Sequence, residues 1–152
     1  MLGNALVALA LAAGPVAPHT LDKKTLSFEG AAAMAAAAEA DARARGLAVV
    51  VVVVDDGGHV ILLHRMNGAQ VASVNVGIGK ARTAAIYRRP SRVFEEQVKN
   101  GRIAALALAD ATPLIGGVPV SVGGQVVGAI GVSGDTPDID EAIALAGVAA
   151  LR

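Results

Sequence analysis

The segment Val49–Val54 is an unbroken run of valine, and it constrains the fold more than any other feature of the chain. Because β-branched side chains are crowded in a helix and fit well on a strand, we predict a strand over residues 47–54. Successive side chains of a strand point to opposite faces, so valine covers both faces of this one. A sheet built around it must therefore be covered on both sides. We expect the chain's own helices on one side and a second copy of the protein on the other.

Turn residues place each predicted strand beside a partner. Asp55-Asp56-Gly57-Gly58 leads from the valine strand into a second strand, and Gly123-Gly124 joins two further strands in a tight hairpin. The second, third and fourth strands are predicted over residues 59–66, 118–122 and 125–132. Because hairpins pair antiparallel, a parallel dinucleotide-binding sheet is disfavoured.

Helices are predicted between and beside these hairpins. Ser27 is a suitable N-cap for an Ala-rich helix that Gly46 ends, and Thr136 caps a helix with Pro137 at its first position. The predicted helices span residues 29–45, 69–87, 91–100 with Ser91 as the cap, and 137 to the C-terminus. The order helix, hairpin, two helices, hairpin, helix indicates an α/β (α+β) fold in which helices pack on a central antiparallel sheet.

Residues 1–18 form a segment of different character. Residues 2–13 are nearly all apolar, but the run is shorter than the roughly 20 residues that span a bilayer. It resembles the apolar part of an export signal, although no Lys or Arg precedes it. Two interpretations stay open, an export signal or a short helix of the mature protein, and the first slightly favours a periplasmic or secreted location. Residues 19–152 are expected to form one ligand-binding domain.

Charge and composition exclude several classes of function. Lys and Arg total 13, as do Asp and Glu, so the chain lacks the basic surface that a nucleic-acid binder needs. There is no cysteine, which excludes disulfides, thiol nucleophiles and cysteine-bound zinc. Zero net charge also puts little repulsion between copies. Together with the doubly apolar strand, this predicts a homo-oligomer.

One stretch is strongly positive. No Asp or Glu occurs between Gly57 and Phe94, and the stretch contains the cations Arg65, Lys80, Arg82, Arg88, Arg89 and Arg92. Because a guanidinium pairs well with a carboxylate, this stretch is a candidate site for a small anionic ligand. Alternatively, these cations meet acids from elsewhere in the fold or from a partner subunit. Lys80 and Arg82 lie beside Gly77 and Gly79, glycines that mark either close packing or close approach of a ligand.

Two histidines and a methionine are weak candidates for binding a metal. His59 and His64 lie an odd number of residues apart, so on one regular strand they face opposite sides. His64 and Met66 share a face, but residues two apart cannot reach opposite sides of one porphyrin. His59 follows the Gly57-Gly58 turn, where either a ligand could reach it or it is simply a hydrogen-bonded turn residue.

Several of these segments in series resemble the GlcG/HbpS family of haem-binding or haem-degrading-like bacterial proteins. The resembling segments are residues 55–59, 65–69, 79–84, 116–120 and 124–134. The resemblance covers roughly residues 21–151. It implies a profilin-like α/β sandwich, a homo-oligomer and, in some members, haem binding. Thr83 lies in the resembling segment 79–84 together with Lys80 and Arg82. It joins the candidate ligand-binding residues, which are His59, Arg65, Lys80 and Arg82.

The leading hypothesis from the sequence is a small-ligand-binding protein whose ligand is haem or another anionic tetrapyrrole. One rival is an enzyme acting on a small organic acid, with Lys80 as base, Arg82 holding the carboxylate, or His59 in the site. Another is an oligomeric accessory protein of a sensor or transport system, without chemistry of its own.

Overall fold

The computed structural model describes residues 19–151, so the predicted export signal at residues 1–18 lies outside the described residues. The sheet has the order β2-β1-β4-β3, and every neighbouring pair of strands is antiparallel. Its strands are β1 (Val50–Asp55), β2 (Val60–Arg65), β3 (Gly117–Val122) and β4 (Gln125–Ser133). The two predicted hairpins and the α/β sandwich with a central antiparallel sheet are therefore confirmed.

The two hairpin turns form for different local reasons. Gly123 and Gly124 both have positive φ angles, +60° and +79°, which suits glycine in a two-residue hairpin. In the β1–β2 turn, the carboxylate of Asp55 accepts hydrogen bonds from the backbone N–H groups of Gly57 (2.8 Å) and His59 (2.9 Å). These bonds hold His59 in the turn, so β2 begins one residue later than predicted.

The helices also follow the prediction, with shifted ends. They are α1 (Phe28–Ala44), α2 (Ser73–Ile86), α3 (Arg92–Lys99) and α4 (Pro137–Ala149), with a short 3-10 helix η1 (Ile103–Ala107) after α3. Ser27 caps α1 as predicted, accepting a 3.1 Å bond from the Gly30 N–H. Ser91 occupies the N-cap position of α3 as predicted, but its hydroxyl makes no capping bond and instead bonds Leu114 and Gly117. Within residues 19–151, no helix combines the length and apolar character needed to cross a bilayer.

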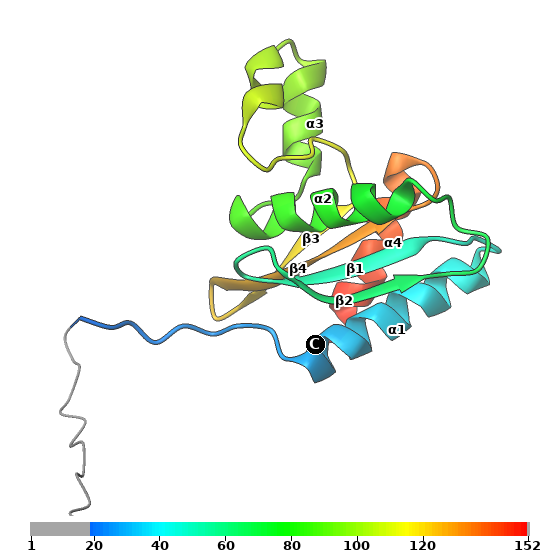
Figure 1. The fold of residues 1–152 in the computed structure, drawn as a ribbon, viewed down its shortest axis with the longest axis horizontal. Helices are drawn as coiled ribbons and strands as arrows, with labels where there is room; N and C mark the ends of the chain where they lie inside the picture. Colours follow the sequence, from blue (N-terminus) through cyan, green and yellow to red (C-terminus); the bar gives the residue numbers. More distant parts are fainter. Residues whose placement is uncertain (1–18, 152) are drawn as a thin grey trace, which may run out of the picture.

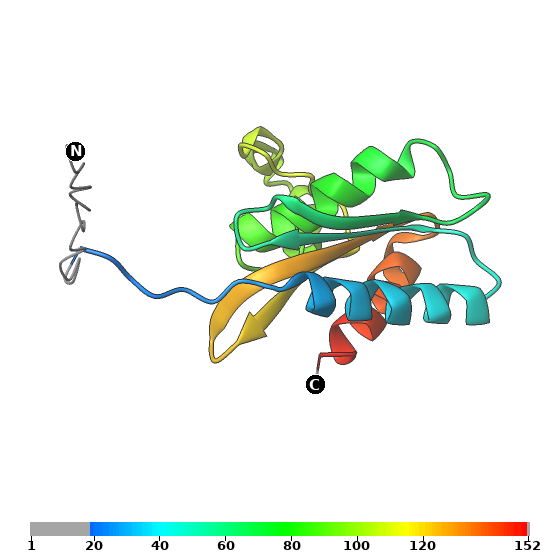
Figure 2. The same cartoon turned by 60° about the horizontal axis from the view of Figure 1, so that its bottom comes forward.

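Helices cover both faces of the sheet. α1 and α4 lie on one side and α2 lies on the other (Figures 1 and 2). Val49, Val51 and Val53 join the core on the α1 and α4 side. Their alternating neighbours pack toward α2: Val50, Val52 and Val54. All six valines are fully buried, and each such side chain contributes roughly 1.5–3 kcal/mol.

The expectation that a second copy covers one face of the sheet is therefore wrong. The chain itself covers this second face of the sheet with α2, which lies close against the strands. A Cβ on Gly77 would lie 3.1 Å from a methyl group of Val52, and a Cβ on Gly131 of β4 would lie against the backbone of Gly77 and Ala81. These glycines mark close packing of helix on sheet. Self-association remains a prediction, but it can no longer be argued from an uncovered face of the sheet.

Candidate functional site

The structure does not bring the five predicted ligand-binding residues together. His59 and Arg82 lie at the β1–β2 turn, where Arg82 Nε donates to the Gly58 carbonyl oxygen at 3.3 Å. Arg65 lies at the far end of β2. Lys80 lines a cavity of its own, which Arg82 does not reach. The two cations of α2 therefore do not share one cleft, contrary to the prediction.

Thr83 serves the fold. Its side chain is fully buried, and its hydroxyl donates to the Gly79 carbonyl at 2.7 Å. The same oxygen accepts a 2.7 Å bond from the Thr112 N–H, so it ties α2 to the segment before β3. Gly79 packs here as well, since a Cβ at this position would meet the Thr112 side chain. With its hydroxyl donating to one protein group and accepting from another, Thr83 is poorly placed to bind a ligand.

Two cavities contain four of the candidates, Arg65, Lys80, His64 and Met66, whereas His59 and Arg82 line neither. The first, called the His64 cavity below, has a volume of about 400 Å³ and opens where the end of edge strand β2 meets α1. It is lined by Glu39, Arg43, Leu63, His64, Arg65, Met66 and Asn67. As predicted, His64 and Met66 lie on the same side of the sheet, toward α1.

The centre of the His64 cavity is a chain of three polar side chains. His64 Nδ1 lies 2.5 Å from Glu39 Oε1, and Glu39 Oε2 lies 3.2 Å from an Arg43 Nη atom. Because an ionised carboxylate only accepts hydrogen bonds, Nδ1 carries the proton that it donates. The ring is thereby oriented with Nε2 as its second nitrogen, in the arrangement that commonly supports metal-binding histidines. Arg65 adds a second exposed guanidinium to the rim.

The second cavity, called the Lys80 cavity, has a volume of about 290 Å³ between α2, α3 and the start of α4. On its floor, Lys80 Nζ lies 2.7 Å from Asp140 Oδ2 and donates to the Val132 carbonyl at 3.0 Å. The other oxygen of Asp140 accepts the Asp135 N–H at 3.0 Å. Both side chains of the ion pair are nearly fully buried. Burial raises the pKa of Asp140, and the Lys80 ammonium opposes that rise.

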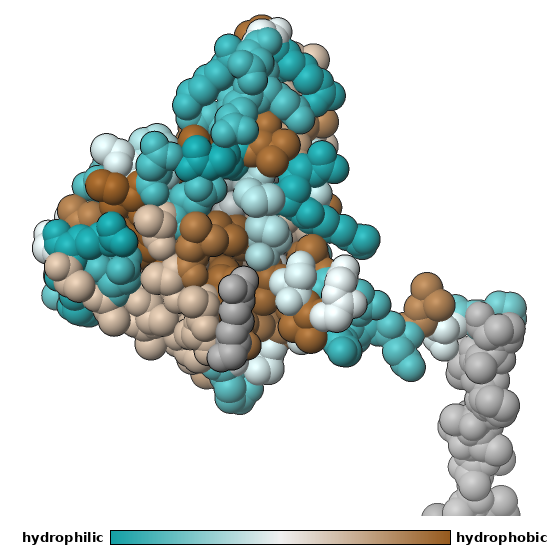
Figure 3. Space-filling model, turned by 180° about the vertical axis from the view of Figure 1, so that it is seen from behind, coloured by the Kyte–Doolittle hydropathy of each residue, from teal (hydrophilic) through white to brown (hydrophobic). Residues whose placement is uncertain are grey.

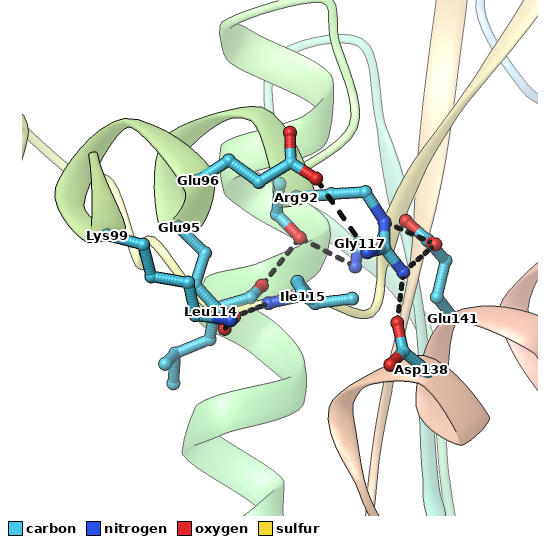
Figure 4. A network of polar contacts seen from close by, with 10 residues as sticks. Arg92, Glu95, Glu96, Lys99, Leu114, Ile115, Gly117, Asp138 and Glu141 are labelled. Atoms are coloured by element: carbon cyan, nitrogen blue, oxygen red, sulfur yellow. Dashed lines mark hydrogen bonds and ion pairs between the residues drawn. The ribbon is translucent and has the colours of Figure 1, made fainter.

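One side of the Lys80 cavity is lined by Glu95 of α3, which forms with η1 a lobe that projects from the body of the fold (Figure 1). Glu95 of α3 accepts a 2.6 Å bond from the Ile115 N–H and pairs with Lys99 at 2.6 Å (Figure 4). Burial raises the pKa of Glu95, but the hydrogen bonds from Lys99 and Ile115 lower it by more, so the pKa of this carboxyl lies below its usual value. The Ser91 hydroxyl donates to the Leu114 carbonyl at 2.6 Å and accepts the Gly117 N–H at 2.8 Å.

Arg92 connects this lobe to α4 through ion pairs. Its guanidinium contacts Asp138 at 2.5 Å and Glu141 at 2.6 Å (Figure 4). Arg92 and Lys80 thus pair with acids far along the chain, as the alternative interpretation of the positive stretch held. Lys80 is nearly buried and paired with Asp140, so its amine is not available as the base that the hypothesis of an enzyme for organic acids gave it.

Sequence reasoning missed Glu39, Arg43, Ser73, Ser133 and the pairing role of Asp140. For Asp140 a signal existed, because residues 140, 143, 144 and 147 have the spacing of one helix face and all four are buried. An acid inside an apolar helix face implies a buried partner. Nothing comparable marks Glu39, which is one of several charged residues on a helix rich in alanine.

Comparison with known proteins assigns the chain to a family. Residues 26–149 match the family described as haem degrading protein HbpS-like. Protein GlcG of Escherichia coli K12 is 48% identical over 79 residues, which cover 52% of this chain and 59% of GlcG, less than two thirds of its length.

Solved structures agree with that assignment. A double mutant of Streptomyces reticuli HbpS superposes with a TM-score of 0.83 at 32% identity, covering 93% of this chain and 99% of that one. A PduOC:heme complex superposes with a TM-score of 0.76 at 26% identity, covering 83% and 94% of the two chains. The family match over residues 26–149 and the superposition over most of both chains together place this chain in the HbpS-like family.

Proposed function

We propose that this protein binds haem, or a closely related anionic tetrapyrrole, at the His64 cavity. The observation that carries the proposal is the His64–Glu39 hydrogen bond of 2.5 Å, which occupies Nδ1 and leaves Nε2 as the candidate iron ligand. Further support comes from the description of the family and from the PduOC:heme complex among its structural relatives.

The lining of the His64 cavity fits the parts of such a ligand. Arg43 of α1 and Arg65 of β2 line the cavity with His64 and can pair with propionate groups. Met66 provides apolar surface on the same side as His64, and Leu63, which packs toward α2, lines the cavity from edge strand β2. When bound, haem supplies an iron centre that accepts an axial ligand. Because Met66 lies next to His64 on the same side, it contributes packing in this proposal and not a second axial bond.

A haemin titration tests the proposal. We expect a saturable Soret band for the full chain and at least ~10-fold weaker binding with an altered band in His64→Ala. His59→Ala is the matched control, because His59 is an exposed histidine at the opposite end of the same hairpin, and it should bind as the parent does. Unchanged affinity and an unchanged spectrum in His64→Ala would refute the assignment of this site.

We also propose that the protein self-associates, through apolar surface at the β3–β4 hairpin and the start of α1. Apolar residues are visible on the face shown in Figure 3. An apolar hollow of about 410 Å³ lies where the start of α1 meets the β3–β4 hairpin, and it includes Leu26, Val122, Val127 and Leu151. Val122 and Leu151 are exposed there. A second copy would cover such a surface.

Sedimentation velocity tests this second proposal. The parent chain should sediment as a dimer or larger species, and Val122→Glu should shift it toward the monomer. A parent chain that is monomeric at the highest soluble concentration would refute self-association.

A further inference from the structure

We infer that the Lys80 cavity is a second ligand site, independent of the His64 cavity, and that it takes a small uncharged molecule bearing hydroxyl groups. The inference does not depend on haem binding, because the two cavities share no lining residue.

Two buried serines point to a ligand. Ser73 at the start of α2 is 2% exposed and Ser133 at the end of β4 is 6% exposed, and both line the cavity. Neither hydroxyl has a protein hydrogen-bond partner among residues 19–151, although every side-chain N or O atom sealed from solvent in that part of the chain has one. The two hydroxyls are therefore accessible from the cavity. A nearly buried hydroxyl without a protein partner gains from a ligand or a water that supplies one.

The charges around the cavity argue for an uncharged ligand. The lining contains one ammonium group, on Lys80, and three carboxylates, on Glu95, Asp135 and Asp140. This excess of negative charge disfavours an anion. Glu95 is already paired with Lys99, and Asp140 with Lys80, so neither needs a cationic ligand. Asp135 is exposed to water and accepts the Thr136 N–H.

Size and apolar surface narrow the ligand class further. At about 290 Å³ the cavity lies at the lower end of the range for small-molecule sites, and it is too small for a porphyrin. The remaining wall is mostly apolar and consists of one polar residue, Gln70, and the apolar residues Ala72, Val76, Leu114, Ile115 and Pro137. A short carbon chain can pack there while its hydroxyl groups exchange hydrogen bonds with Ser73 and Ser133. Hydroxyl groups suit this pair because each can donate and accept.

Amide chemical shifts of the isotope-labelled full chain test the inference with defined probes. The uncharged probes are glycerol, propane-1,2-diol and dihydroxyacetone, and lactate and protonated 2-aminopropan-1-ol are charged probes of matched size. We expect saturable shifts around Ser73, Lys80 and Ser133 with at least one uncharged probe, and weaker binding of both charged ones. No saturable shift with any uncharged probe, or tighter binding of a charged one, would overturn the inference.

Variants localise the binding. Replacing both serines (Ser73→Ala with Ser133→Ala) should weaken the best probe ~10-fold, because two hydrogen bonds are lost. Ser121→Ala, an exposed serine on β3, is the matched control and should have no effect. If the double variant does not fold, Ala72→Phe replaces it, since a bulky side chain at this exposed lining position should block the cavity. Unchanged affinity in the folded variant would refute the site. The haemin titration of the same variants should be normal, so failure here is distinguishable from failure of the haem proposal.

Discussion

The two cavities each contain a basic side chain against a carboxylate, but they differ in burial. In the His64 cavity the side chains of His64 and Glu39 are 42% and 19% exposed, whereas those of Lys80 and Asp140 are 5% and 3% exposed. An exposed pair is screened by water and contributes little to folding, so its groups remain available to a ligand. A buried pair cannot lose one member without leaving a charge in an apolar interior. The difference in burial therefore suits the His64–Glu39 pair to ligand binding and the Lys80–Asp140 pair to stabilising the fold.

The largest expected effect comes from breaking the buried pair. Lys80→Met should lower the free energy of unfolding at neutral pH by about 3–5 kcal/mol, because Asp140 is left buried without its partner. Urea denaturation measures the loss. Combining Lys80→Met with Asp140→Leu should recover most of it, since the double variant removes both charges. Arg82→Met, on the same helix but without a carboxylate partner in the described residues, is the control, and an equal loss there would contradict our account.

A smaller effect is expected in the wall of the Lys80 cavity. Ser91→Ala removes the hydroxyl that joins the start of α3 to Leu114 and Gly117, and it should cost about 2 kcal/mol. Because the bonds join α3 to the start of edge strand β3 and do not reach the central strands, hydrogen exchange should accelerate in α3 more than in β1. Equal acceleration in both elements would show that the lobe is not a separate unit.

The fall of the free energy of unfolding at acidic pH should depend on Glu95. Its pKa is lowered in the folded state, since the Lys99 and Ile115 donors outweigh the opposing effect of burial. The folded state therefore holds this proton less tightly than the unfolded state does. The resulting stabilisation is complete above the ordinary value of 4.5 and is lost as pH falls through the lowered pKa.

Glu95→Gln should remove that contribution. We expect the variant to be less stable near neutral pH by about 1 kcal/mol and to lose stability less steeply in acid. Thermal unfolding between neutral and strongly acidic pH measures both. A variant with the same acid slope as the parent would show that Glu95 does not titrate as described.

The smallest effect on stability should come from breaking the exposed pair. Glu39→Gln should change the free energy of unfolding by no more than about 1 kcal/mol. It should nevertheless weaken haemin binding by roughly 10-fold, because His64 loses the carboxylate that orients it. A destabilisation as large as that of Lys80→Met would remove the contrast between the two cavities.

Local features of the sequence were enough to predict the elements and most of their order. The valine run, the Gly123-Gly124 hairpin and the Ser27 cap act over a few residues, so their consequences can be deduced without the rest of the fold. The hydrogen-bond partner of a side chain could not be predicted where that partner lies in a distant segment. Ser91 lies at the predicted N-cap position of α3, but its hydroxyl bonds Leu114 and Gly117 and not the helix that it precedes.

The sequence by itself determined that the valine strand is covered on both faces, that the sheet is antiparallel, and that the chain belongs among the HbpS-like proteins. Only the tertiary structure decided which helix provides the second cover, and which charges meet. Lys80 and Asp140 are 60 residues apart, and His64 and Glu39 are 25 apart. Whether such residues touch depends on the rotation of each helix against the sheet, which packing of the whole core sets. Burial, and with it the role of each pair, follows from that packing and cannot be deduced from residue type or local spacing.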